Sequence, residues 1–174
     1  MLETIAIVVA LLIVVAVAGL LILAATKPNT FSVVRATTIK APPERIFAAI
    51  SDFRNWGAWS PYDKKDPTIK RTLGGTASGK GSLYAWEGDR NVGIGSMEIM
   101  DTSPPSKVRI KLDFVKPFEA HNIVDFTLEP QGDGTKVAWT MQGPLPYFAK
   151  VVHVIFNMDK MVGTDFEVGL ANLK

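Results

Sequence analysis

Few side chains in this sequence are suited to acid–base chemistry. Its only histidines are His121 and His153, and Asp159 is a carboxylate within an otherwise apolar helical pattern. Imidazole titrates near neutral pH, so His121, with Asp125 close by, is a conceivable general base. No spacing distinguishes His121 from an ordinary edge or surface histidine, and His153 falls off the apolar positions, where a surface residue is expected. The sequence therefore predicts no catalytic residue.

Motifs for metal ions and phosphate groups are also missing. The chain has no cysteine, and two histidines without ligand spacing predict no metal site. Two glycine pairs, Gly79 with Gly81 and Gly93 with Gly95, lack the full spacing of phosphate-binding loops. They are better interpreted as bulges or bends in a curved sheet. We expect no bound metal and no cofactor.

The overall charge argues against one class of partner. The chain carries 19 Lys and Arg against 17 Asp and Glu, a net charge of +2 over 174 residues. No run of basic residues concentrates this charge, so the footprint of a nucleic-acid-binding protein is absent. We expect no nucleic-acid partner.

Aromatic and apolar side chains offer a different chemistry, the binding of a hydrophobic ligand. Ordinary core packing must explain several of them. Trp59 and Tyr62 belong to a polar loop, where an amphipathic ring suits the mouth of a pocket. The candidate ligand-binding residues are Trp59, Tyr62, Trp86, Phe114, Trp139, Met141, Phe156 and Asp159.

Asp159 has three possible roles, because a carboxylate on a buried helix face is costly unless it is hydrogen-bonded or paired. In the first, Asp159 pairs with an arginine or a Trp N–H group and makes a structural contact. In the second, it faces a cavity, where it orients a ligand or acts as an acid or base. In the third, it lies on a kinked or exposed part of the helix.

The N-terminal segment predicts a membrane anchor in residues 1–27. Residues 5–25 are uninterrupted Ile, Val, Leu, Ala and Gly, and as a helix they span about 30 Å, the thickness of a bilayer core. A cleaved signal peptide is the main alternative. Against it, the start MLE has no basic side chain, and the apolar run exceeds the usual hydrophobic region of about 7–15 residues. Lys27, Arg35 and Lys40 follow the segment, which places the rest of the chain on the cytoplasmic side.

Residues 28–174 predict an α+β domain. A β-branched strand at Phe31–Ile39 precedes a helix that starts around Pro42, a short turn at residues 53–56 and a loop at residues 59–62 that contains Pro61. Further strands separated by glycine and proline follow at residues 68–73, 79–87, 92–101, 107–114, 119–129 and 135–142. The strict alternation in residues 107–114 is typical of a half-buried antiparallel strand.

A single long helix is predicted for Pro146–Leu173, where apolar residues recur at a helical period. At about 1.5 Å per residue it is roughly 40 Å long. Gly163 and Gly169 are small gaps in its apolar face, which allow a close approach or a bend. One helix cannot fill a strongly curved sheet, and the two short helices close one end, so we expect an apolar, aromatic cavity between sheet and helix.

Several stretches carry a family resemblance. They are IKAPPERIFAAISDFRNWGAWSPYDKKDP (Ile39–Pro67), Gly79–Glu98, Phe126–Gly143 and Met158–Lys174. The chain resembles the polyketide cyclase/dehydrase and lipid transport group of the START-like (SRPBCC) superfamily, and MDKMVGTDFEVGL resembles a membrane-anchored bacterial subgroup. The resemblance implies a helix-grip fold, in which a curved antiparallel sheet wraps around a long C-terminal helix and holds a hydrophobic ligand.

The fold does not define the reaction, so three functions stay open. The leading hypothesis is a membrane-tethered module that binds a lipid or another hydrophobic small molecule. The second is an enzyme of the cyclase or dehydratase type that uses Asp159, His121 or Glu98 as its acid or base. The third is a protein-interaction domain at the membrane.

Overall fold

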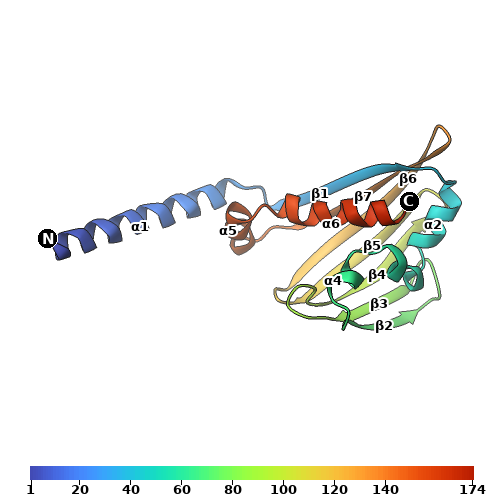
Figure 1. The fold of residues 1–174 in the computed structure, drawn as a ribbon, viewed down its shortest axis with the longest axis horizontal. Coiled ribbons are helices and arrows are strands. Elements are labelled where there is room, and N and C mark those ends of the chain that lie inside the picture. Colours follow the sequence, from blue (N-terminus) through green and yellow to red (C-terminus); the bar gives the residue numbers. More distant parts are fainter.

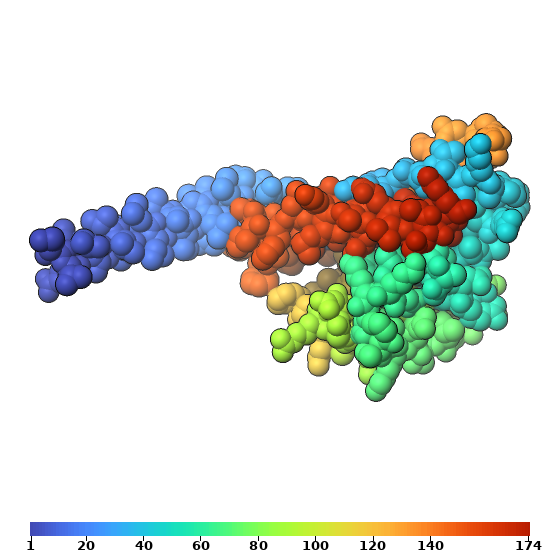
Figure 2. All heavy atoms as spheres, in the orientation of Figure 1, coloured from blue at the N-terminus to red at the C-terminus, as the bar shows by residue number.

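The computed structural model describes all 174 residues as a projecting N-terminal helix followed by an α+β domain (Figure 1). Helix α1 (Leu2–Thr26) is exposed along its length, and Ala24 is its one buried residue. It is the one helix that is long and apolar enough to cross a membrane, although a signal sequence has the same features. The space-filling view shows it as a rod that leaves one end of the domain (Figure 2).

The domain is built on one seven-stranded antiparallel sheet with the order β1-β7-β6-β5-β4-β3-β2. Every strand predicted from the sequence is present, with ends displaced by a few residues. The strands are β1 (Thr30–Ile39), β2 (Lys70–Gly75), β3 (Ser82–Glu87), β4 (Ile94–Ser103), β5 (Lys107–Lys116), β6 (Ala120–Gln131) and β7 (Gly134–Pro144).

The inner face of the sheet follows the predicted alternation. On β5, Val108 and Ile110 are fully buried, while the intervening Arg109 pairs with Asp125 at 2.9 Å on the outer face. The inward residues of β6 and β7 are likewise buried: Val124, Phe126, Leu128, Val137, Trp139 and Met141. The core therefore lies on one side of the sheet, as a period of two residues requires.

Two glycine pairs were predicted to mark bulges or bends of this sheet. Gly79 and Gly81 lie in the connection between β2 and β3, while Gly93 and Gly95 lie at the start of β4. The register between β4 and β5 shifts between Ile94 and Gly95, as the predicted bulge or bend requires. A side chain on Gly95 would collide with the Trp86 ring, so the close approach of Trp86 depends on this glycine. Gly93, with a φ of +70°, has a backbone conformation that other residues rarely adopt.

Short helices close one end of the sheet, as predicted. They are α2 (Pro43–Ile50), the 3-10 helix η1 (Phe53–Asn55), α3 (Trp56–Trp59) and α4 (Tyr62–Lys65). Asp52 caps η1 by accepting the backbone N–H of Arg54 at 2.9 Å. The loop predicted at residues 59–62 is shorter than expected, because α3 reaches Trp59 and α4 begins at Tyr62, leaving Ser60 and Pro61 between them.

The prediction of one long C-terminal helix is wrong. The segment forms two helices, α5 (Tyr147–Ile155) and α6 (Met158–Asn172). Phe156 adopts an extended backbone, and the Asn157 side chain caps α6 by accepting the Lys160 backbone N–H at 2.9 Å. The apolar period continues across this break, so periodicity alone could not reveal it. Helix α5 contacts the end of α1, whereas α6 lies along β1 (Figure 1).

The two glycines of α6 allow the close approach that was expected of them. A Cβ atom on Gly169 would lie 2.8 Å from the Trp139 ring and 3.1 Å from Pro61. A Cβ atom on Gly163 would collide with the guanidinium of Arg35. Helix α6 therefore docks on β1 and β7 through its glycines.

Candidate ligand-binding cavity

A cavity of about 950 Å³ lies between the inner face of the sheet, α5, α6 and the short helices. This volume is near the upper end of the range of about 300–1,000 Å³ that ligand pockets occupy. Hydrophobic residues make up 24 of its 36 lining residues. Such a space suits an apolar ligand of substantial size.

The closed end of the cavity is aromatic and lies beneath α6. Trp139 from β7 stacks on Phe166 from α6, with ring centroids 4.0 Å apart and planes 9° from parallel. Trp56 and Tyr62, from the short helices, also line this region. Burial and the nearby Asp165 carboxylate raise the pKa of Tyr62, so its hydroxyl group keeps its proton and is available as a donor.

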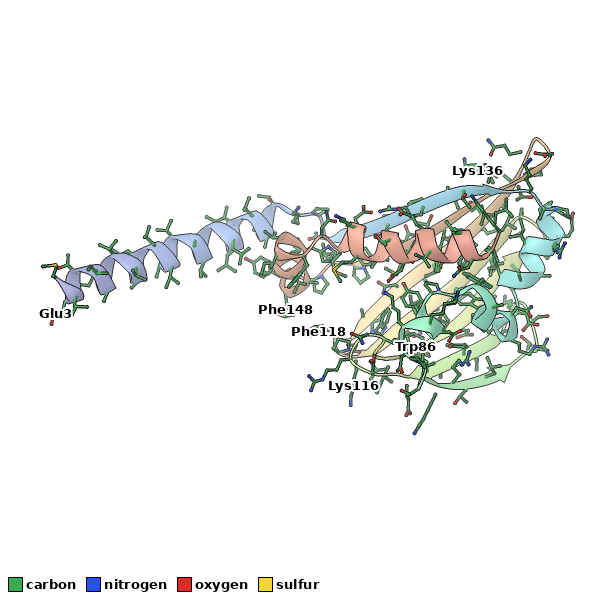
Figure 3. All side chains as sticks on the ribbon, viewed as in Figure 1. Glu3, Trp86, Lys116, Phe118, Lys136 and Phe148 are labelled. Atoms are coloured by element: carbon green, nitrogen blue, oxygen red, sulfur yellow. The ribbon has the colours of Figure 1, made fainter.

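The opposite end of the cavity opens beside α1. Phe118, from the β5–β6 loop, and Phe148, from α5, approach each other there with ring centroids 5.7 Å apart (Figure 3). Both belong to the cavity lining, yet their exposed fractions are 64% and 63%. In Figure 2 the surface is hollowed between the red C-terminal helices and the yellow loop. This mouth is therefore flanked by exposed aromatic rings.

The structure brings five of the eight predicted site residues to the cavity wall. They are Tyr62, Trp86, Phe114, Trp139 and Met141. They come from α4, β3, β5 and β7, so the curvature of the sheet gathers them from distant parts of the chain.

Three of the predicted residues lie elsewhere. Trp59 is a core residue, 2% exposed, that packs between Trp56 and Trp139 instead of at a mouth. Its indole N–H donates to the carbonyl oxygen of Ala49 at 3.4 Å. Phe156 is 54% exposed, because the break between α5 and α6 turns it outward.

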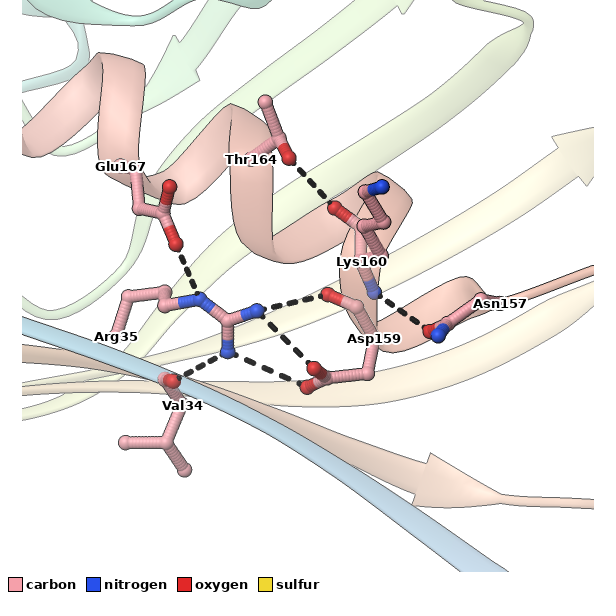
Figure 4. Close-up of polar contacts among 7 residues, drawn as sticks. All are labelled: Val34, Arg35, Asn157, Asp159, Lys160, Thr164 and Glu167. Carbon is pink, nitrogen blue, oxygen red and sulfur yellow. Dashed lines mark hydrogen bonds and ion pairs between the residues drawn. The ribbon is translucent and has the colours of Figure 1, made fainter.

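Asp159 also lies outside the cavity, on an exposed part of α6 where 61% of its side chain is accessible. Figure 4 shows its contacts with Arg35. The Arg35 guanidinium from β1 donates to the Asp159 carboxylate at 3.0 Å and to its backbone oxygen at 3.1 Å. The same guanidinium reaches Glu167 at 2.7 Å. Pairing with Arg35 lowers the pKa of Asp159. The pairing with an arginine and the exposed position are thus both confirmed, the cavity-facing role is wrong, and the ion pair ties α6 to β1.

Two polar residues of α5 line the cavity and were not predicted to do so. Lys150 is buried, with an exposed fraction of 7%, and its Nζ donates to Asn29 Oδ1 at 2.7 Å. His153 is half-buried against Phe31, at 5.7 Å between ring centroids, and burial lowers its pKa. The expected surface position of His153 is wrong because the helix break lets α5 turn this face inward. The signal that could have found them is the spacing of Lys150 and His153, since residues three apart share one face of a helix.

The remaining acid–base candidates differ in position. His121 lines the cavity rim, and its Nδ1 lies 2.7 Å from Asp113 Oδ1, a hydrogen bond that raises the pKa of His121. Its side chain is 61% exposed. Glu98 is exposed on β4 and does not line the cavity. No group of three or more His, Cys, Asp or Glu side chains is arranged to hold a metal ion.

Comparison with known proteins agrees with this architecture. A family model described as polyketide cyclase/dehydrase and lipid transport matches residues 30–174, so the chain belongs to this family. No curated protein matches the chain significantly.

Solved structures show the same fold at low sequence identity. Protein MLL2253 from Mesorhizobium loti is 18% identical with a TM-score of 0.59, over 82% of this chain and 96% of its own. Aha1 from Colwellia psychrerythraea is 20% identical with a TM-score of 0.57, over 83% and 93%. DynU16, from the dynemicin biosynthetic locus, is 14% identical with a TM-score of 0.56, over 84% of this chain and 46% of its own.

Proposed function

We propose that this protein is a membrane-tethered module that binds a lipid or another hydrophobic small molecule. The observation that carries the proposal is the cavity of about 950 Å³ with its mostly hydrophobic lining. A well-packed domain of this size keeps few voids larger than a water molecule, so a preserved apolar space of this volume suits a ligand. Family membership is consistent with this use.

The tether in this proposal is residues 1–27, and the binding domain is residues 28–174. Helix α1 exposes apolar side chains all round and has the length of a bilayer core. The Tyr147 hydroxyl of α5 donates to the Leu21 carbonyl oxygen at 2.9 Å. This contact holds α5 against the last turns of α1, which supports a cavity mouth close to the membrane surface in this proposal. The basic residues that follow α1 favour the cytoplasmic side for the domain.

An enzyme of the cyclase or dehydratase type is the second candidate. One observation favours it: His121, which accepts or donates a hydrogen bond with Asp113, is among the residues at the rim of the cavity, although Asp113 is not. Asp159 and Glu98 do not reach the cavity, so the acid–base groups considered for such chemistry reduce to one exposed histidine. This is why the binding function is preferred.

Filling the cavity tests the binding function. The full chain in phosphatidylcholine nanodiscs is titrated with the neutral fluorescent hydrophobe N-phenyl-1-naphthylamine, and protein-free nanodiscs provide the background. The double variant Met97→Trp/Val162→Trp adds two large rings at half-buried wall positions. The matched control Leu83→Trp/Val168→Trp adds the same rings at positions that are each 44% exposed.

We expect the wild type and the control to bind the probe, and the cavity-filling variant to bind it about tenfold more weakly or worse, which corresponds to about 1.4 kcal/mol. Probe binding that equals the protein-free background in the wild type would reject the proposal. Equal binding by both double variants would place the probe on another surface.

A further inference from the structure

Lys150 is a buried cation without an anionic partner in the protein. Its exposed fraction is 7%, and it lines the cavity near the mouth. An ammonium group has three N–H donors, and here Asn29 Oδ1, at 2.7 Å, accepts one of them. No carboxylate lies within 4 Å of its Nζ. Burying a charge is costly unless that charge is paired, so the arrangement lacks an anion.

The carboxylates that line the cavity are already engaged. Glu119 lies 3.3 Å from the Nε2 of His121 at the rim. Asp165, at the closed end, forms an ion pair with Lys65 at 2.6 Å. Neither satisfies Lys150, so an anion for this lysine must come from outside the protein.

The position of Lys150 defines how such a ligand would lie. Its partner Asn29 follows the end of α1 by three residues, and Tyr147, on the preceding turn of α5, contacts α1 directly. Lys150 is therefore at the end of the cavity nearest α1. The apolar wall continues from there to Trp139 and Phe166 at the closed end.

We propose that the cavity binds an anionic amphiphile, with its carboxylate or phosphate head on Lys150 and Asn29 and its hydrocarbon chain directed toward Trp139. This inference rests on the proposed binding function and adds the chemical class of the ligand. The charge-assisted hydrogen bond explains why a lysine, and not an apolar residue, occupies this buried position.

Three soluble ligands with the same chain test the inference. Decanoate, decyl phosphate and decan-1-ol are titrated calorimetrically at pH 8 into the full chain in phosphatidylcholine nanodiscs, with protein-free nanodiscs as the blank. We expect one or both anions to bind about tenfold or more tightly than the alcohol, as a hydrogen bond to a charged group predicts. Whichever of decanoate and decyl phosphate binds more tightly indicates whether the head group of the ligand is a carboxylate or a phosphate.

Two substitutions locate the effect. Lys150→Met should abolish the preference for the anion while leaving decan-1-ol binding unchanged, and Lys150→Arg should retain it. Lys160→Met is the matched control, because Lys160 is exposed on α6 and outside the cavity lining. The preference in the wild type is measured independently of whether any variant folds.

The outcomes separate this inference from the function on which it rests. Equal binding of the alcohol and both anions by the wild type would overturn the anionic class and leave the binding function standing. An anion preference that survives Lys150→Met would also overturn it. Binding of none of the three ligands would reject both proposals.

Discussion

The stacked pair of Phe166 and Trp139 offers a direct measure of how α6 is held on the sheet. Phe166 is 1% exposed and lies parallel to the Trp139 ring at 4.0 Å. Gly169, on the next turn, allows the same tryptophan to approach the helix backbone. Replacing Phe166 with alanine removes this stacked contact between α6 and β7.

The expected loss in the free energy of unfolding is about 3–5 kcal/mol, the usual cost of truncating a buried phenylalanine to alanine. The lost stacking accounts for about 0.5–1.5 kcal/mol of it. Because a domain of this size is stable by about 5–15 kcal/mol, the effect is a large part of the total. Val168→Ala, at an exposed position on the same helix, should change stability by about 0.5 kcal/mol or less.

Urea unfolding of the full chain in nanodiscs, followed by tryptophan fluorescence, measures both variants. The comparison uses the midpoint and slope of each transition, because a shifted midpoint with an unchanged slope measures a change in the free energy of unfolding. A loss below about 1 kcal/mol for Phe166→Ala would refute this account, because it is smaller than the cost of opening a void at a well-packed site.

Three further predictions concern other contacts. Gly163→Ala should lower the midpoint of thermal unfolding in the wild type, because the new Cβ atom meets Arg35. In an Arg35→Ala background the same substitution should raise the midpoint, because alanine stabilises a helix by about 1 kcal/mol relative to glycine. Equal effects in both backgrounds would contradict the close approach. Burial lowers the pKa of His153, so its contribution to stability is complete above the unfolded value of 6.5 and is lost as the pH falls below it. Urea unfolding at pH 7.5 and 5.5 should therefore show a larger acid loss for the wild type than for His153→Gln, and equal losses would argue against a buried neutral imidazole. Phe118→Ser/Phe148→Ser should slow the uptake of a fluorescent fatty acid from vesicles while leaving the thermal midpoint nearly unchanged, since both rings are mostly exposed; an unaltered uptake rate would assign the mouth to another part of the surface.

The sequence by itself determined the elements that depend on local chemistry. The alternation in β5 predicted which side chains face the core, and glycine and proline marked the ends of the strands. The uncharged run in α1 predicted a helix with the length of a bilayer core. Gly163 and Gly169 indicated either a close approach or a bend, and the structure shows the close approach. Each of these signals lies within one element, where residue spacing and backbone preferences act directly.

Only the tertiary structure decided what faces the cavity. Asp159 pairs with Arg35, which is 124 residues away, and Lys150 reaches Asn29, which is 121 residues away. Both contacts follow from the break at Phe156 and Asn157, which gives α5 and α6 different directions (Figure 1). An apolar period reports that a helix has a buried side, but the direction of that side follows from long-range packing. For this reason the sequence predicted an apolar cavity but not the buried lysine at its mouth.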